Sequence, residues 1–112
     1  MPIQHWSENI WVVKLANEPA LSDDLTLTRD EVQRADPAPD LAIDFAAVSR
    51  MSSSNLSELL RLRKTMIDRD GRIKLASIPD NIWVVFLTTG LDKVFEFAED
   101  VPTALAALQI KS

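Results

Sequence analysis

The segment from Leu41 to Met66 constrains the fold more than any other, because its hydrophobic period changes partway along. Apolar side chains alternate with others at Leu41, Ile43 and Phe45, which predicts one face of a short buried strand. After a serine-rich stretch, apolar residues recur about every 3.6 positions, which predicts a helix. The predicted buried stripe of this helix consists of Leu56, Leu59, Leu60, Met66 and Ile67. Its charged residues lie mostly on the other side: Arg61, Arg63, Lys64 and Asp68.

The serines Ser52, Ser53 and Ser54 lie where the predicted strand gives way to the helix. Ser54 or Asn55 is the expected N-cap, and Asn55 followed by Glu58 has the spacing of a capping box. A helix N-terminus has unpaired N–H groups and a partial positive charge, so it tolerates a phosphate. A serine there could be phosphorylated without loss of the fold and would then alter any surface docked on it. The plainer interpretation, a turn and a cap only, stays open.

The N-terminal third of the chain predicts a hairpin followed by a helix. Residues 3–6 and 10–15 are short hydrophobic runs around a polar turn, which is typical of a hairpin. Both faces of the second run are apolar, which indicates a strand inside a sheet: Trp11, Val13 and Leu15 on one face, Ile10 and Val12 on the other. Residues 20–35 predict a helix that Ser22 or Asp23 would cap. Its sparse apolar stripe consists of Leu21, Leu25 and Val32.

The remaining segments continue the alternation of strands and helices. Residues 36–40 contain two prolines and predict a surface loop too short to separate domains. Residues 72–78 and 94–97 predict two more strands, and 101–108 predict a short final helix. In the first of these strands, one face is expected to present Ile73, Leu75 and Ser77.

Residues 82–87 are continuously apolar, and on local sequence alone they would be assigned to a buried strand. Pro79 suits the first turn of a helix and Gly90 suits a helix end, so we predict a helix here. Such a helix has more apolar residues than one buried stripe needs, which leaves three of them nearer the surface: Trp83, Val84 and Leu87. Either they form a docking or dimer contact, or the N-terminal segment covers them, or they belong to the core outright.

Composition narrows the class of protein. A chain of 112 residues fits one compact core and therefore one domain. A net charge of −5 and a pI of about 4.7 argue against nucleic-acid binding. The absence of cysteine excludes disulfides, thiolate nucleophiles and cysteine-ligated metals, and it is compatible with the cytoplasm, the expected location. We expect no signal peptide and no membrane span, because no apolar segment approaches about 20 residues.

The sequence offers little for catalysis, and an enzyme is not expected. His5 is the only histidine and has no cysteine or second histidine with which to form a triad or a zinc site. Acidic pairs occur as Asp23 with Asp24, and as Glu96 with Glu99 and Asp100, but these are interpreted as capping and solvent-facing charges. Asp44, at the end of the central strand, is expected to bond backbone amides of the following loop. No cofactor and no metal site are predicted.

The order of these motifs resembles the STAS domain of bacterial anti-sigma factor antagonists. The serine turn, Ser52-Ser53-Ser54-Asn55-Leu56, is similar to the family's Asp-Ser-Ser-Gly-Leu at the opening of a helix. Gly71 begins a segment that resembles the family's glycine-then-strand step, and it lies where the preceding helix would need a left-handed cap. Thr89-Gly90-Leu91-Asp92-Lys93-Val94-Phe95 closely resembles the family's Thr-Gly-Leu-Asp-Lys-Val-Phe. The resemblance covers about residues 10–110.

The resemblance implies an α/β fold with a mixed, mostly parallel sheet of four or five strands and about four helices. It also implies a partner, an anti-sigma factor that is also a serine kinase, which binds the serine turn and helix 54–70 and phosphorylates the first serine of the pair. By position that serine is Ser53, with Ser54 and Ser52 as weaker candidates. The expected partner-binding residues are Ser52, Ser53, Ser54, Asn55, Glu58, Trp83, Val84 and Leu87. A monomer or a weak dimer is expected, with no nucleic acid and no membrane insertion.

Three positions depart from the family pattern. Ser52 replaces the aspartate before the serine pair, Asn55 replaces the glycine, and Ala20 falls near the place of an earlier aspartate. Two other functions are therefore kept beside the first. The chain could be an unphosphorylated STAS docking subunit of a lipid-transport ATPase complex, or a STAS module that binds a nucleotide or another small ligand.

Overall fold

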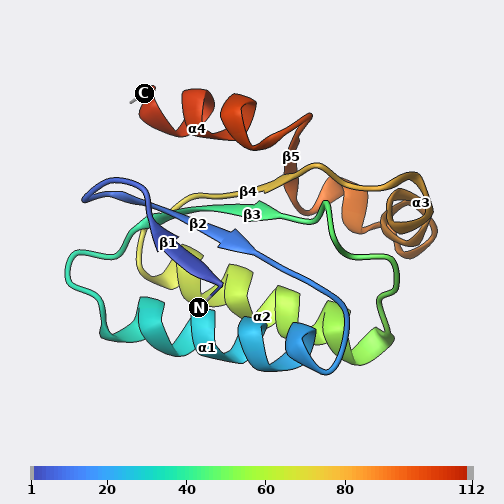
Figure 1. Cartoon of the computed structure of the whole chain (residues 1–112). Coiled ribbons are helices and arrows are strands. Elements are labelled where there is room, and N and C mark those ends of the chain that lie inside the picture. The colour runs from blue at the N-terminus through green and yellow to red at the C-terminus, as the bar shows by residue number, and fades with distance from the viewer. Residues whose placement is uncertain (1, 111–112) are drawn as a thin grey trace.

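The computed structural model describes residues 2–110 and shows a five-stranded sheet with helices on both faces (Figure 1). The strand order is β1-β2-β3-β4-β5, so neighbours in the sequence are neighbours in the sheet. The strands are β1 Ile3–His5, β2 Ile10–Lys14, β3 Asp40–Asp44, β4 Ile73–Ala76 and β5 Glu96–Ala98. Only β1 runs antiparallel to its neighbour. The predicted hairpin and the predicted mixed, mostly parallel sheet are thus confirmed.

Four α-helices and one 3₁₀ turn connect the strands. The helices are α1 Ala20–Arg34, α2 Ser53–Asp68, α3 Asp80–Thr89 and α4 Val101–Gln109, and the 3₁₀ turn η1 is Leu91–Lys93. α1 and α2 run side by side under the sheet, whereas α4 lies alone over its other face (Figure 1). Within residues 2–110, no helix combines the length and the apolar character that a membrane crossing needs.

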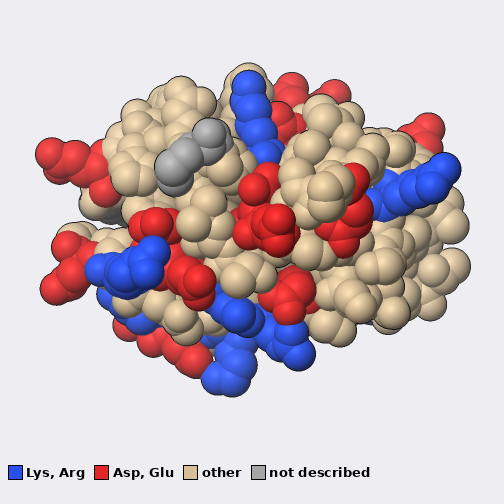
Figure 2. Space-filling model, turned by 60° about the horizontal axis from the view of Figure 1, so that its bottom comes forward, with Lys and Arg blue, Asp and Glu red and all other residues tan. Residues whose placement is uncertain are grey.

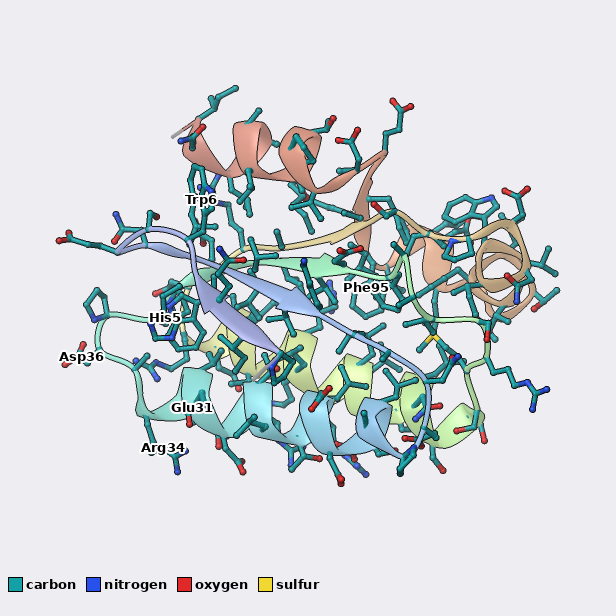
Figure 3. All side chains as sticks on the ribbon, viewed as in Figure 1. His5, Trp6, Glu31, Arg34, Asp36 and Phe95 are labelled. Atoms are coloured by element: carbon teal, nitrogen blue, oxygen red, sulfur yellow. The ribbon has the colours of Figure 1, made fainter. Side chains whose placement is uncertain are left out.

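The sheet separates two apolar clusters. The larger lies between the sheet and helices α1, α2 and α3, and it includes Phe45 and Phe86, both fully buried. Figure 3 shows Phe95 pointing into this layer. The smaller cluster lies under α4 and consists of Ile10, Val12, Ala42, Ala76, Ala104 and Leu108. Because alternate residues of a strand face opposite sides, β2 contributes to both clusters, as its doubly apolar pattern predicts.

The apolar stripe of α2 differs from the prediction at two positions. Leu60 is 37% exposed and Ile67 is 51% exposed, whereas Leu62 is fully buried. The stripe that faces the sheet and α1 runs through Leu56, Leu59, Leu62 and Met66. The 3.6-residue period was right, but its phase was set by which side chains meet the sheet, and the sequence does not specify that.

The C-terminus of α2 also corrects a prediction, because Asp70 rather than Gly71 adopts the left-handed conformation, with φ of 59°. The Gly71 N–H donates to the Met66 carbonyl at 2.8 Å and the Asp70 N–H to the Ile67 carbonyl at 3.1 Å, which is a Schellman motif shifted by one residue. Gly71 is needed for space instead. A Cβ there would lie 2.6 Å from Met66 Cε and 2.8 Å from the Pro39 carbonyl oxygen.

Residues 80–89 form the helix α3, so the strand that local sequence favoured is not formed. α3 begins after Pro79 and ends at Gly90, whose φ of 75° is the left-handed region that glycine tolerates. Val84 and Leu87 are 54% and 49% exposed, as predicted. Trp83 is less exposed than these two residues, because one face of its ring packs against Phe97. The two rings stand at right angles with centroids 4.9 Å apart.

Two strand predictions need correction. β4 ends at Ala76, because Ser77 takes a positive φ of 59° and turns the chain away from the sheet. Ser77 therefore does not share a strand face with Ile73 and Leu75. β5 begins at Glu96, because η1 occupies the residues just before Val94.

Candidate partner-binding site at the serine turn

The candidate site lies where three parallel strands end together. β2, β3 and β4 are in register at their carboxyl ends, with Lys14 opposite Asp44 and Asp44 opposite Ala76. The loops that leave these strands lead into α1, α2 and α3, so they gather at one edge of the sheet (Figure 1). Loops at the carboxyl ends of the strands are the usual binding edge of an open α/β sheet.

Side chains from neighbouring loops fix the β3–α2 loop in place. Asn17 Oδ1 accepts from the Ser49 N–H at 2.8 Å, and Asn17 Nδ2 donates to Ser49 Oγ at 2.9 Å. From the start of α3, Asn81 Nδ2 donates to the Ser49 carbonyl at 2.6 Å. Asp44 Oδ1 accepts from the Ala46 N–H at 2.9 Å, which is the role expected for that carboxylate. The loop before the serines is therefore held from both sides.

The N-cap of α2 is Ser52, not Ser54 or Asn55 as predicted. Ser52 Oγ accepts from the Asn55 N–H at 3.2 Å, while Asn55 Oδ1 accepts from the Ser52 N–H at 2.9 Å. This reciprocal pair is a capping box with asparagine in the place of the usual glutamate. The predicted box between Asn55 and Glu58 is not formed, because the helix starts at Ser53 and Glu58 lies in its second turn.

The three serines differ in what their hydroxyls bond. Ser52 Oγ also donates to Asn55 Oδ1 at 3.0 Å, so both functions of this hydroxyl are used inside the cap. Ser53 and Ser54 are exposed, and within residues 2–110 their hydroxyls have no hydrogen-bond partner. The geometry therefore leaves Ser53 and Ser54 open to a second molecule and commits Ser52 to the helix.

Asn55 is 1% exposed and links the start of α2 to the start of α1. Its Nδ2 donates to Glu18 Oε2 at 3.1 Å and to Ser22 Oγ at 3.2 Å. The same Glu18 accepts from the Ser22 N–H at 2.8 Å through Oε1. The N-cap of α1 is Pro19, not Ser22 or Asp23 as predicted. The Ser22 N–H, which lies in the first turn of α1, donates to the Glu18 carboxylate instead. The four side chains of Glu18, Ser22, Ser52 and Asn55 are here called the cap cluster.

Glu18 is the site residue that the sequence interpretation missed. It stands two positions before Ala20, near the place of the family's earlier aspartate, and it bonds the residue that replaces the family's glycine. The signal that could have identified it is its position four residues before Ser22, from which its carboxylate reaches the Ser22 N–H in the first turn of α1. Together with neighbouring residues it lines an open cleft of about 510 Å³: Asn17, Glu18, Ser49, Arg50, Ser52 and Asn55.

Hydrogen bonds hold the pKa of Glu18 below its usual value of 4.5, first those from the Ser22 side chain and backbone and then that from Asn55. A carboxylate with a lowered folded-state pKa adds stability that is fully present above about pH 4.5 and lost as the pH falls through the folded-state value. We therefore expect the difference in Tm between the wild type and Glu18→Gln to shrink as the pH falls below 4.5. Thermal unfolding at several pH values from 7 to 3 measures this Tm difference. A difference that stays the same at every pH would contradict the lowered pKa of Glu18.

Asn55→Ala is expected to lower the free energy of unfolding by about 2 kcal/mol, because the capping box and the bonds to the Glu18 carboxylate are lost together. Urea denaturation measures this change. The matched control is Ser54→Ala, one residue earlier, where an exposed hydroxyl without a partner is removed and the change should stay within about 0.5 kcal/mol. Equal effects of the two variants would show that the cap cluster does not stabilise the fold.

Two other residues that the sequence singled out, Glu58 and His5, make contacts of their own. Glu58 forms ion pairs with Arg29 at 3.8 Å and with Arg61, on the outer face of α1 and α2. Figure 2 shows acidic and basic side chains mixed over this side of the molecule, without a continuous basic patch. His5 stacks on Trp11, with ring centroids 4.5 Å apart and planes at 7°.

Two of the acidic residues that were considered for catalysis, Asp100 and Glu96, make structural contacts instead. Asp100 Oδ1 accepts from the Thr103 N–H at 2.8 Å and caps α4, and Glu96 pairs with Lys74. Burial and then repulsion by Asp23 raise the pKa of Asp24. In the described part of the chain, no three metal-ligating side chains gather in one place.

Comparisons with known proteins agree with this architecture. The sequence profile of the STAS domain matches residues 13–104. An anti-sigma-factor antagonist (STAS) domain protein from Planctomyces limnophilus is 21% identical with a TM-score of 0.82, and the alignment covers 96% of this chain and 97% of that one. A serine-to-glutamate variant of RsbS from Moorella thermoacetica is 16% identical with a TM-score of 0.81 and coverages of 96% and 93%.

The cell fate determinant SpoIIAA of Bacillus, in its phosphorylated form, is 18% identical with a TM-score of 0.66 and coverages of 87% and 89%. At these identities the likeness to solved structures shows the fold alone. Curated protein sequences gave no significant match.

Proposed function

The chain belongs to the STAS domain family, and from that premise we propose that it is an anti-sigma factor antagonist whose binding to its partner is controlled by phosphorylation of Ser53. The partner is an anti-sigma factor that is also a serine kinase. It docks on the serine turn and on the exposed face at the start of α2. The unmodified protein binds it, and the phosphorylated protein releases it.

One observation carries this proposal: Ser53 is an exposed serine in the first turn of a helix whose start is fixed by its neighbours. A protein kinase needs a hydroxyl that reaches into its own active site, and the Ser53 side chain meets that need. The cap cluster supports the same arrangement, because Ser52 and Asn55 hold the backbone of the turn while the hydroxyl beside them stays free.

The physical basis of release is the charge that a phosphate adds. Phosphoserine carries about −1.5 to −2 charges at pH 7. In the free protein, the N–H groups and dipole of α2 stabilise this charge, so the fold is retained. In the complex the same phosphate has to lose water at the interface, and it meets any acidic group of the partner at close range. Phosphorylation therefore weakens the complex more than it affects the fold.

The kinase reaction tests the proposal directly. The protein is used to capture its partner from native lysate, and the captured complex is then supplied with Mg²⁺ and ATP. Trypsin cuts after Arg50 and Arg61 and releases the peptide 51–61, which contains the whole serine turn. We expect mass spectrometry to place one phosphate on Ser53. Ser53→Ala should abolish the modification, and Ser54→Ala should leave it.

The other outcomes are equally informative. A phosphate on Ser54 or on Ser57 alone would overturn the assignment to Ser53. A stable complex with an ATPase subunit and no phosphate on the peptide would favour the unphosphorylated docking subunit instead.

A further inference from the structure

A small pocket of about 360 Å³ lies between the start of α3 and the edge strand β5. It is lined by Ile78, Asp80, Trp83, Phe97, Ala98 and Glu99. The rings of Trp83 and Phe97 are 4.9 Å apart at 89°, so they meet as two walls of a corner. Its volume is at the lower end of the roughly 300–1,000 Å³ typical of small-molecule sites, which suits one long side chain rather than a cofactor.

Two carboxylates stand beside these aromatic walls, and both are exposed. Within residues 2–110, the carboxylate groups of Asp80 and Glu99 have no hydrogen bond and no ion pair. Five carboxylates of the described residues pair with a cation, namely Glu31, Asp40, Glu58, Asp68 and Glu96, whereas Asp80 and Glu99, like several others on the surface, do not. The pocket thus combines aromatic surface with unbalanced negative charge.

We infer that this pocket binds an arginine side chain of the partner protein. A guanidinium group stacks favourably on an aromatic face within about 6 Å, and its N–H groups bond carboxylates at the same time. Arginine fits better than lysine, because its planar group is less strongly hydrated and can stack and donate together. An uncharged apolar side chain would fill the corner but would leave the two carboxylates without a partner.

The start of α3, which lines the pocket, also contacts the loop that leads to the serine turn, and this contact gives the arginine a place near the same interface. Asp80 precedes Asn81, the residue that donates to the Ser49 carbonyl in the loop before the serines. The inference rests on the proposed function in assigning the arginine to the partner that docks on the serine turn. The pocket itself depends on no phosphorylation.

Nuclear magnetic resonance of the ¹⁵N-labelled full chain tests the pocket with a defined probe, Nα-acetyl-arginine amide. The indole N–H signals of Trp6, Trp11 and Trp83 report on three separate places, and Trp→Phe variants assign them. We expect saturable shifts at Trp83 and at the Ala98 amide, with Kd on the order of 1–10 mM, and no shift at the other two indoles. The matching citrulline amide, which has nearly the same shape without the charge, should bind several-fold more weakly, and the lysine amide should also bind more weakly.

The double variant Asp80→Asn/Glu99→Gln should weaken the arginine probe by roughly three- to tenfold. The control Glu8→Gln/Asp36→Asn removes the same net charge from two exposed positions outside the pocket and should leave the affinity unchanged. Thermal unfolding checks that both double variants keep the fold. Equal binding of citrulline, equal or tighter binding of lysine, shifts confined to other residues, or an unchanged affinity of the pocket variant would each overturn the inference. None of these results depends on Ser53 or on the identity of the partner, so a failure here is distinct from a failure of the proposed function.

Discussion

Phe86→Ala is expected to lower the free energy of unfolding by about 3–5 kcal/mol, the largest effect among the variants considered. Phe86 is fully buried on α3, and its ring packs edge-to-face against three others: Phe45 at 6.2 Å, Phe95 at 6.1 Å and Phe97 at 5.2 Å between centroids. Alanine would leave a cavity at the centre of this group, which the surrounding rings fill only in part. Urea denaturation followed by circular dichroism measures the loss.

Val84→Ala is the matched control for Phe86→Ala on the same helix. Val84 is 54% exposed, so its truncation should change the free energy of unfolding by no more than about 0.5 kcal/mol. The pair also tests the secondary structure. Residues 84 and 86 would share one face if this segment were a strand, whereas in a helix they point in different directions. Comparable large losses from both variants would contradict the helix.

Ser53→Asp is expected to weaken binding to the partner by at least about 100-fold, because it places a permanent negative charge at the centre of the proposed interface. Ser53→Ala removes the hydroxyl without adding charge and should keep the affinity of the wild type within a few-fold. Isothermal titration calorimetry with the purified partner measures both variants. Undiminished binding of Ser53→Asp would reject control by charge at this position.

The fold should not be weakened by Ser53→Asp. The first turn of α2 contains no acidic residue, and an aspartate there interacts favourably with the helix dipole, by roughly 0.3–1 kcal/mol. Ser7→Asp is the matched control for charge. Ser7 Oγ accepts from the Asn9 and Ile10 N–H groups in the β1–β2 turn, a role that aspartate also performs, and this turn lies at the opposite end of β2 from the serine loop. The Ser7→Asp variant should bind the partner with the affinity of the wild type.

The α3 segment shows which structural features the sequence predicts and which depend on tertiary packing. Residues 82–87 are apolar without interruption, so no period in them distinguishes a strand from a helix. Pro79 and Gly90 mark the two ends of the helix, and both lie outside the ambiguous run. Packing then selected Ile82 and Phe86 as the buried face and left Val84 and Leu87 in solvent. The flanking residues predicted the type of element, and contacts with distant phenylalanines determined its orientation.

The candidate site divides in the same way. The position of the serines between a strand and a helix was predictable, because the change of hydrophobic period lies on either side of them. The identity of the cap was not, since Ser52, Ser54 and Asn55 are all good N-cap residues. The bond from Asn55 to Glu18 spans 37 positions in the sequence, and no local pattern indicates it.

The sequence by itself determined the order and type of the elements and the location of the serine turn. Those features follow from local periodicity and from residues with strong backbone preferences, which act over a few positions. Only the tertiary structure decided that Ser52 is committed to the cap while Ser53 stays free, that Glu18 joins the cap cluster, and that Trp83 and Phe97 form a corner beside two carboxylates. Each of these features depends on contacts between residues that are distant in the chain or on the exact residue at which a helix begins. Packing of the helices against the sheet determines these contacts and these starting points.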